Sequence, residues 1–136
     1  MIEIDNVSKT FTVKDKTVKA VRNVSLHIAK GSIYGIIGFS GAGKSTLVRC
    51  INMLEKPTSG KITVNGAELT ALSEKQLRKE RKKIGMIFQH FDLMPSRTAA
   101  DNIALALHGS GLSKAQIKEK VDKLLSYVEL SDRATS

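Results

Sequence analysis

The sequence predicts an α/β fold in which an antiparallel β-layer comes first and a parallel core follows. Over residues 2–13 and 18–28, apolar side chains alternate with polar ones, which is typical of strands with one face in water. Residues 33–37 and 84–88 are nearly all apolar, which is typical of parallel strands buried on both faces. Helical spacing of apolar residues follows both runs. The types of strand and their order therefore indicate a β-layer joined to an α/β core.

Local signals delimit the shorter elements. The charged stretch 14–16 predicts a turn between the first two strands, and we expect a bulge in the second strand near 22–23. A short strand at 61–64 is followed by Asn65-Gly66, which predicts a tight turn. The predicted helices cover about 44–54, 73–82, 98–107 and a final segment that begins at 113.

Two of these helices begin with the same signal. Ser73 is followed three residues later by Gln76, and Ser113 is followed in the same way by Gln116. In such a capping box the serine and glutamine side chains bond to backbone N–H groups that the first helical turn leaves free. We therefore expect helices to begin at these two serines.

The composition is that of a soluble globular domain, since 41% of the 136 residues are hydrophobic and 26% are charged. The net charge of +9 favours anionic partners such as nucleotides. Six cations and two acids fall within residues 74–83, and no aromatic side chain lies among them to stack on bases. This pattern predicts a solvated helix face, and we expect no nucleic-acid partner.

Cys50 is the single cysteine, so an internal disulfide is excluded and a reducing compartment is favoured. Its apolar neighbours Leu47, Val48 and Ile51 predict an inert, buried thiol. The first residues carry acids where a signal peptide carries cations, and no apolar run is long enough to span a bilayer. We therefore expect a cytoplasmic protein that reaches a membrane only through a partner.

One segment matches the phosphate-loop pattern G-x-x-x-x-G-K-[ST] at every fixed position, namely Gly38-Phe39-Ser40-Gly41-Ala42-Gly43-Lys44-Ser45. An apolar strand is predicted before it and a helix after it, as the binding geometry requires. A glycine-rich turn without a ligand is the plain alternative, but such a turn needs neither a lysine nor a serine at these offsets. A lysine desolvated there without an anion would also be costly. The segment therefore predicts a site for the phosphates of a nucleoside triphosphate, which we take to be ATP with Mg²⁺.

Each part of this loop has a physical role. The glycines let successive backbone N–H groups turn inward and form an anion-binding nest. Lys44 is a point charge that reaches the β- and γ-phosphates, and it is our first candidate for a catalytic residue. The Ser45 hydroxyl would take one position on octahedral Mg²⁺, and Thr46 is placed to donate to the α-phosphate. The other residues of the predicted cofactor-binding loop are Gly38, Phe39, Ser40, Gly41, Ala42 and Gly43.

The order of these segments resembles the ATP-binding subunits of ABC transporters, in which a β-subdomain precedes the phosphate loop. Phe11 stands where the family carries an aromatic residue that stacks on adenine. Residues 55–60 resemble the family's turn after the loop helix, and residues 84–89 resemble its strand leading into the Q-loop. By this resemblance Gln89 would act in catalysis by contacting Mg²⁺ or the attacking water. A core position for Phe11 and an ordinary loop position for Gln89 are the plain alternatives.

Within the family, segments 47–52, 88–93 and 96–98 resemble the subunits that drive methionine import. Phe39 departs from the family pattern because a small residue is usual there, and Asp92 stands where Asn is common. Residues 94–95 resemble importers of polar amino acids instead. The resemblance implies that Mg-ATP binding powers amino-acid uptake, with methionine as the expected substrate.

The resemblance also implies a domain layout and partners. Residues 1–136 would form part of a nucleotide-binding domain with the P-loop NTPase fold of ABC ATPases. About 1–95 would be the ATP-binding core with its β-subdomain, and about 96–136 the start of the helical subdomain. Residues from Phe91 to Asn102 would form the groove for the coupling helix of a transmembrane permease subunit. A second copy of the ATPase would be a further partner, and the protein would lie on the inner face of the cell membrane through its permease.

The family's later motifs do not occur in this sequence. It contains no LSGGQ-type signature, no apolar strand ending in Asp-Glu (the Walker B motif) and no switch histidine after them. Glu129 has no apolar strand before it and does not replace the missing glutamate. The sequence therefore resembles the N-terminal part of a longer ATPase, and we expect this part alone to show little or no turnover. Two alternatives stay open: a small phosphate-loop kinase whose lid would use Arg78 and Arg81, and a nucleotide-binding module without hydrolysis.

Overall fold

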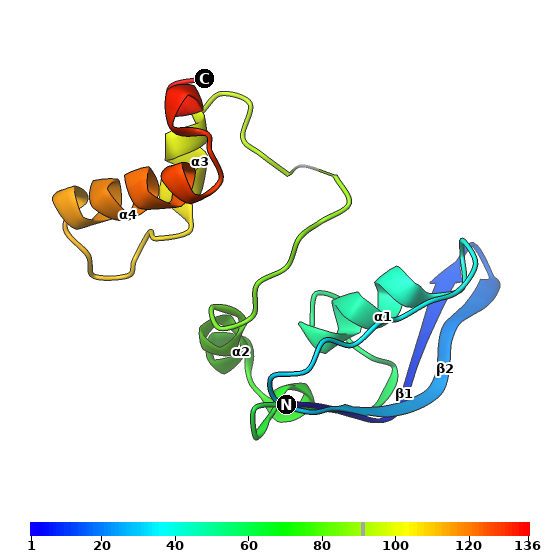
Figure 1. The fold of residues 1–136 in the computed structure, drawn as a ribbon. Coiled ribbons are helices and arrows are strands. Elements are labelled where there is room, and N and C mark those ends of the chain that lie inside the picture. The colour runs from blue at the N-terminus through cyan, green and yellow to red at the C-terminus, as the bar shows by residue number, and fades with distance from the viewer. Residues whose placement is uncertain (91) are drawn as a thin grey trace. The chain divides into compact units, whose positions relative to one another are not determined.

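The computed structural model describes residues 1–90 and 92–136, so Phe91, the first residue of the predicted permease groove, lies outside the described residues. The chain divides into two compact units, Met1–Met86 and Ile87–Ser136. The first unit contains all the described strands, and the second contains the last two described α-helices (Figure 1).

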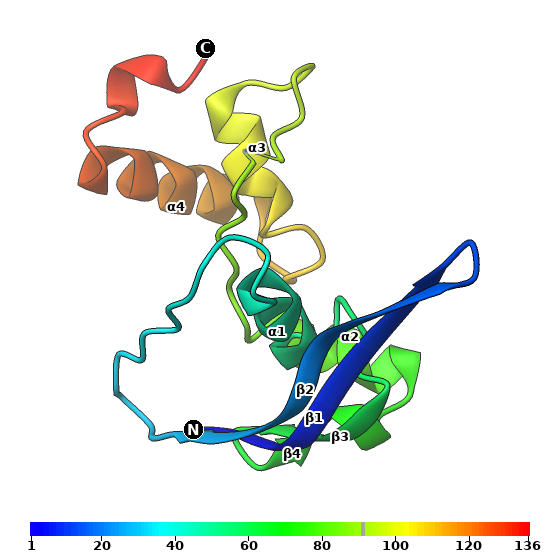
Figure 2. The same cartoon turned by 90° about the vertical axis from the view of Figure 1, so that its right-hand side faces the viewer.

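The first unit is built on a four-stranded sheet with the order β2-β1-β3-β4. Every neighbouring pair is antiparallel. The strands are β1 (Ile2–Val13), β2 (Lys16–Ile28), β3 (Ser59–Val64) and β4 (Ala67–Glu68). Figure 2 shows β1 and β2 as a long hairpin, with β3 beside β1 and the short β4 beside β3. The structure thus confirms the predicted antiparallel layer at the start of the chain.

The turns and the bulge of this sheet follow from local sequence. Lys14 and Asp15 connect β1 to β2 with φ values of 45° and 63°, which is the conformation of a tight two-residue hairpin turn. On β1, Val7 and Lys9 are two residues apart, whereas their β2 partners Val24 and Val21 are three apart. One extra residue therefore lies on β2 at positions 22–23, and the predicted bulge is confirmed.

Helix α1 (Lys44–Ile51) packs its apolar side against the sheet. A 3-10 turn, η1 (Leu69–Ala71), and helix α2 (Glu74–Arg81) follow β4. The Ser73–Gln76 capping box forms as predicted. The buried core joins these elements through side chains that are almost all aliphatic: Ile4, Val7, Val21, Leu47, Cys50, Ile51, Met53, Ile62, Val64, Leu69 and Leu77.

The two predicted parallel strands do not form, which corrects the sequence-based expectation. Residues 33–37 and 84–88 have no regular secondary structure, and Ile33, Ile37 and Ile87 are fully exposed. A strand needs a neighbour to pair with its backbone N–H and C=O groups. No described strand of this chain pairs with either segment. An apolar run predicts that a segment can be buried in a sheet, but it does not provide the neighbouring strands.

The second unit is a small helical assembly of α3 (Ala99–Leu105), α4 (Lys114–Tyr127) and the 3-10 turn η2 (Ser131–Arg133). Thr98 caps α3 by accepting a hydrogen bond from the Asp101 amide, and the capping box at the start of α4 forms as predicted. Along residues 1–90 and 92–136, no helix combines the length and the apolar character that crossing a bilayer would require.

We expect the Cys50 thiol to be unreactive in the folded protein, because it is completely buried and desolvation raises its pKa. A raised pKa means that folding favours the neutral thiol. This stabilisation is present below the unfolded-state pKa of about 8.5 and is lost as the pH rises through the folded-state pKa. Urea titrations should show the stability difference between the wild type and Cys50→Ala shrinking above about pH 8.5. Rapid labelling of Cys50 by a disulfide reagent at neutral pH without urea would contradict the prediction.

Candidate phosphate-binding site

The phosphate loop adopts a curled backbone immediately before α1. Gly41 has φ = 78°, and Gly43, which caps α1, has φ = 92°. The Ala42 amide bonds to the Phe39 carbonyl at 3.1 Å and closes the turn between them. No side chain caps α1, so its first N–H groups are free for an anion. The loop therefore has the backbone shape of an anion nest followed by the positive end of a helix.

Strand β2 passes very close to this loop at Gly43. A side chain at this position would overlap the carbonyl oxygen of Ala20, and its Cβ would also contact Val21. Glycine is needed here for two reasons, because φ is positive and because the strand leaves no room for a Cβ. Gly41 also has a positive φ, but open space surrounds it. The start of α1 therefore packs directly against the backbone of β2.

Lys44 folds its side chain back over the loop. Its Nζ donates to the carbonyls of Gly38 and Phe39, at 2.7 Å each. An ammonium group has three donors, so one N–H remains for a further acceptor. Lys44 thus both closes the loop and keeps a positive charge directly beside the nest.

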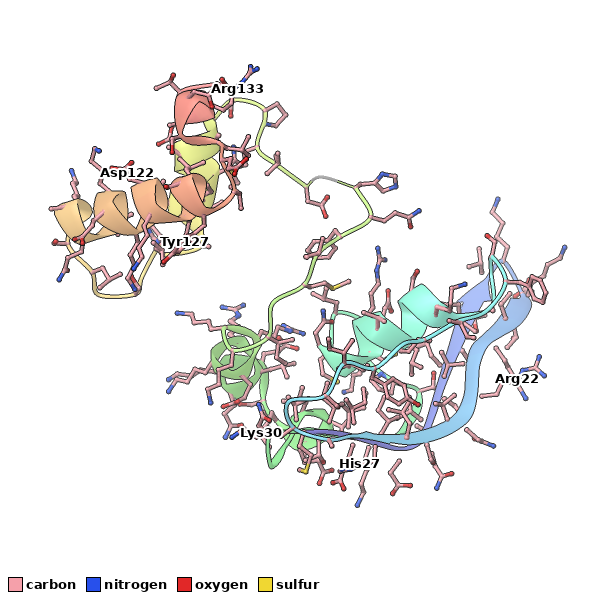
Figure 3. The ribbon with its side chains drawn as sticks, in the orientation of Figure 1. Arg22, His27, Lys30, Asp122, Tyr127 and Arg133 are labelled. Carbon is pink, nitrogen blue, oxygen red and sulfur yellow. The ribbon has the colours of Figure 1, made fainter. Side chains whose placement is uncertain are left out.

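A cavity of about 580 Å³ lies between the loop, the start of α1 and β2. This volume is within the usual range for small-molecule sites. Its charged lining residues, within the described part of the chain, are the cations Lys19, Arg22 and Lys44, and no carboxylate lines it. Lys19 and Arg22 are exposed, and the Arg22 side chain extends outward from β2 (Figure 3). The cavity is therefore suited to an anion.

Ser45 and Thr46 lie in the first turn of α1 and both line this cavity. Ser45 is exposed and Thr46 is half-buried. Mg²⁺ in nucleotide sites is typically held by one or two protein oxygens together with phosphate oxygens. A single exposed hydroxyl at the mouth of an anion nest fits that donor set. The residues present are therefore compatible with a triphosphate and its Mg²⁺.

Phe11 lies on β1 and does not line the cavity. Its partner across the hairpin is Val18, which does line it. Lys9 Nζ lies 4.8 Å from the centre of the Phe11 ring, and the same ammonium pairs with Glu55 at 3.1 Å. The Phe11 ring thus makes a cation–π contact with a lysine of its own strand. Its stacking on adenine stays a prediction.

Gln89 belongs to the second unit, where it is exposed and outside any helix or strand. The phosphate loop belongs to the first unit, and the contact of Gln89 with Mg²⁺ or water stays a prediction. In the second unit, the Asn102 side chain accepts from the Met94 amide at 2.9 Å. The two N–H groups of its Nδ2 are shared among three carbonyls, of Met94, Arg97 and Thr98, at 3.0–3.2 Å. One side chain therefore shapes the described part of the predicted permease groove.

The part of β2 that faces the loop was not predicted from the sequence. Ala20 and Val21 form the surface on which Gly43 rests, and Val18 and Val24 extend the same wall. The only local signal was the alternation of apolar residues that defined the strand. That alternation says which residues share a face, but not which distant segment they contact.

Comparison with known proteins agrees with this geometry. The model of the ABC transporter family matches residues 21–136, which include the loop, α1 and most of β2. The chain is 56% identical over 136 residues to the methionine import ATP-binding protein MetN of Vibrio vulnificus (strain YJ016). It is 53% identical over 136 residues to MetN of Escherichia coli O157:H7. Each alignment covers 100% of this chain and 40% of the relative, so the chain spans less than half the length of these curated relatives.

Two solved structures show the same fold. MJ0796, a bacterial ABC transporter cassette solved as a dimer, superposes with a TM-score of 0.92 at 34% identity. The same cassette, as a dimer in a post-hydrolysis state bound to ADP and phosphate, superposes with a TM-score of 0.90. Both superpositions cover 99% of this chain and 60% of the other. With the family model matching most of its length and the phosphate loop in place, the chain belongs to the ABC transporter family.

Proposed function

We propose that this chain binds Mg-ATP as the N-terminal part of the ATP-binding subunit of an ABC importer. The observation that carries the proposal is the loop of Gly38–Ser45, whose free amides and Lys44 ammonium face a cavity without a carboxylate in its described lining. An anionic ligand offsets the positive charge gathered there. The relatives named above support a nucleoside triphosphate as that ligand.

The residues of the site would contact different parts of Mg-ATP. The nest and the first turn of α1 would bind phosphate oxygens, and the third N–H of Lys44 would donate to the β- or γ-phosphate. Ser45 would hold Mg²⁺, which when bound would neutralise part of the negative charge of the phosphates. Thr46 would donate to the α-phosphate. Phe11 would stack on adenine beside the β2 wall, and Gln89 would contact the metal or the attacking water.

The transport role rests on the relatives. Their name, methionine import ATP-binding protein, supports methionine as the substrate of the complete protein. Membership of the ABC transporter family favours this role over a small kinase and over a module without hydrolysis. We further propose a transmembrane permease as partner, contacted near Phe91–Asn102, and a second copy of the ATPase, as in the dimeric cassettes. The protein would then be cytoplasmic and peripheral on the inner face of the cell membrane.

We expect Lys44→Ala to weaken Mg-ATP binding by about tenfold or more, because hydrogen bonds to charged groups contribute about 1.5–3 kcal/mol. AMP affinity should change much less, since Lys44 serves the phosphates beyond the first. Calorimetry with both nucleotides measures the two effects. Lys120→Ala is the matched control, because it removes the same charge from an exposed position of α4. Equal ATP affinity in the Lys44→Ala variant and the wild type would show that the nest is not the binding site.

Gly43→Ala should be more harmful than Gly41→Ala. Both substitutions place a Cβ at positive φ, which costs about 1–2 kcal/mol, but only the Gly43 variant also drives a Cβ into the Ala20 carbonyl. Urea unfolding should show a clearly larger loss of stability for Gly43→Ala, and calorimetry a larger loss of Mg-ATP affinity. Equal losses of stability and affinity in the two variants would show that the contact of Gly43 with β2 does not constrain the loop.

The isolated chain should release phosphate from ATP at least about 100-fold more slowly than an intact ABC importer. The sequence contains no glutamate in the position of a catalytic base, and general-base catalysis contributes about 10²–10⁴-fold. A steady-state phosphate-release assay checks this, with Lys44→Ala as the background measurement. Turnover similar to that of an intact importer would mean that residues 1–136 already contain the catalytic groups.

A further inference from the structure

Arg81, in the last turn of α2, holds the end of α1 that lies opposite the phosphate loop. Its Nε donates to the Asn52 carbonyl at 3.1 Å, and its Nη2 donates to the Met53 carbonyl at 2.5 Å. Asn52 caps the C-terminus of α1, and Met53 is the residue after it. The planar guanidinium thus binds two successive carbonyls with two of its donors, which fixes its orientation.

The charge of Arg81 matches the polarity of α1. The C-terminal end of a helix carries a partial negative charge, and its N-terminal end carries a partial positive charge. Arg81 is placed at the negative end, while the positive end of the same helix faces the anion nest. The Arg81 side chain is only 29% exposed, so water screens it less than a free surface cation. Its Nη1 also lies 3.9 Å from a carboxylate oxygen of Glu74, at the start of α2.

Asn52 adds a second attachment at the same end of α1. Its side chain is buried, accepts a hydrogen bond from the Leu54 amide at 3.0 Å and contacts Met86 Sδ through Nδ2 at 2.8 Å. The end of α1 is therefore held both by α2 and by the segment that ends at Met86. A helix of eight residues is marginal by itself and depends on such contacts for its position.

From these contacts we propose that Arg81 is a positioning residue for the phosphate site. It fixes α1 from its C-terminal end, so that the N–H groups of the first turn stay aimed at the nest. The inference deepens the proposed function and rests on it, because it takes the ligand to be the phosphates of Mg-ATP. Arg81 itself touches no nucleotide in this scheme.

The test compares three variants of the 136-residue chain. Arg81→Met removes the charge and the donors but keeps the length of the side chain, whereas Arg81→Lys keeps the charge and one direct donor group. Arg78→Met is the matched control, because Arg78 is an exposed arginine on the same helix. Two measurements are made on each: Mg-ATP affinity by calorimetry, and amide hydrogen exchange of α1 relative to β1 and β3.

We expect Arg81→Met to bind Mg-ATP about twofold to fivefold more weakly than the wild type, the range typical of one charge at a helix end. Amides of α1 should exchange faster while those of β1 and β3 keep their rates, because a purely structural role would loosen the whole unit instead. Arg81→Lys should recover part of the affinity, and Arg78→Met should match the wild type. If Arg81→Met does not fold, the same comparison of Arg81→Lys with Arg78→Met decides the question.

Two results would overturn the inference. One is an unchanged affinity and unchanged α1 exchange in both Arg81 variants. The other is an equal loss in Arg78→Met, which would indicate a general attraction of ATP to cations. Failure of the proposed function looks different, because the wild type itself would then not bind Mg-ATP. In that case faster α1 exchange in the Arg81 variants would still support the anchoring of the helix, and unchanged exchange would refute it.

Discussion

The candidate site depends on the close approach between β2 and the start of α1. Gly43 lies against the Ala20 carbonyl with no space for a side chain, and this contact sets where the phosphate loop ends and the helix begins. The position of β2 is in turn set by its pairing with β1 and by the bulge at 22–23. Ser8 and Asn23 bond to each other across that bulge, at 2.8 and 2.9 Å, and hold its shape. An anion nest built on glycines is thereby supported by the paired strands of the sheet.

Helix α1 is short, and its placement comes from tertiary contacts rather than from helix propensity. Leu47, Cys50 and Ile51 bury one side of it in the core, while Arg81 binds the carbonyls at its C-terminal end. The two ends of the helix thus meet opposite charges, a proposed phosphate at one and a guanidinium at the other. Both arrangements are favourable for the helix dipole.

The apolar segments 33–37 and 84–88 show that an apolar strand pattern does not by itself predict that a strand forms. Their composition suits the interior of a parallel sheet, yet both are irregular, and Ile33, Ile37 and Ile87 are fully exposed. Backbone pairing is a property of two segments, and no strand in the described part of this chain pairs with either of them. The structural relatives nevertheless match 99% of the chain, so the fold class holds although these strands do not form here.

The sequence by itself determined the features that depend on neighbours along the chain. The hairpin turn at Lys14–Asp15, the two capping boxes and the phosphate loop each need only a few adjacent residues, because their hydrogen bonds close within one turn. Only the tertiary structure decided which distant groups meet. Alternation along β2 could not show that Ala20 supports Gly43, and the cations of α2 gave no sign that Arg81 alone turns inward to the end of α1. Such contacts join residues that are 23 and 29 positions apart, and the packing of the folded core selects them.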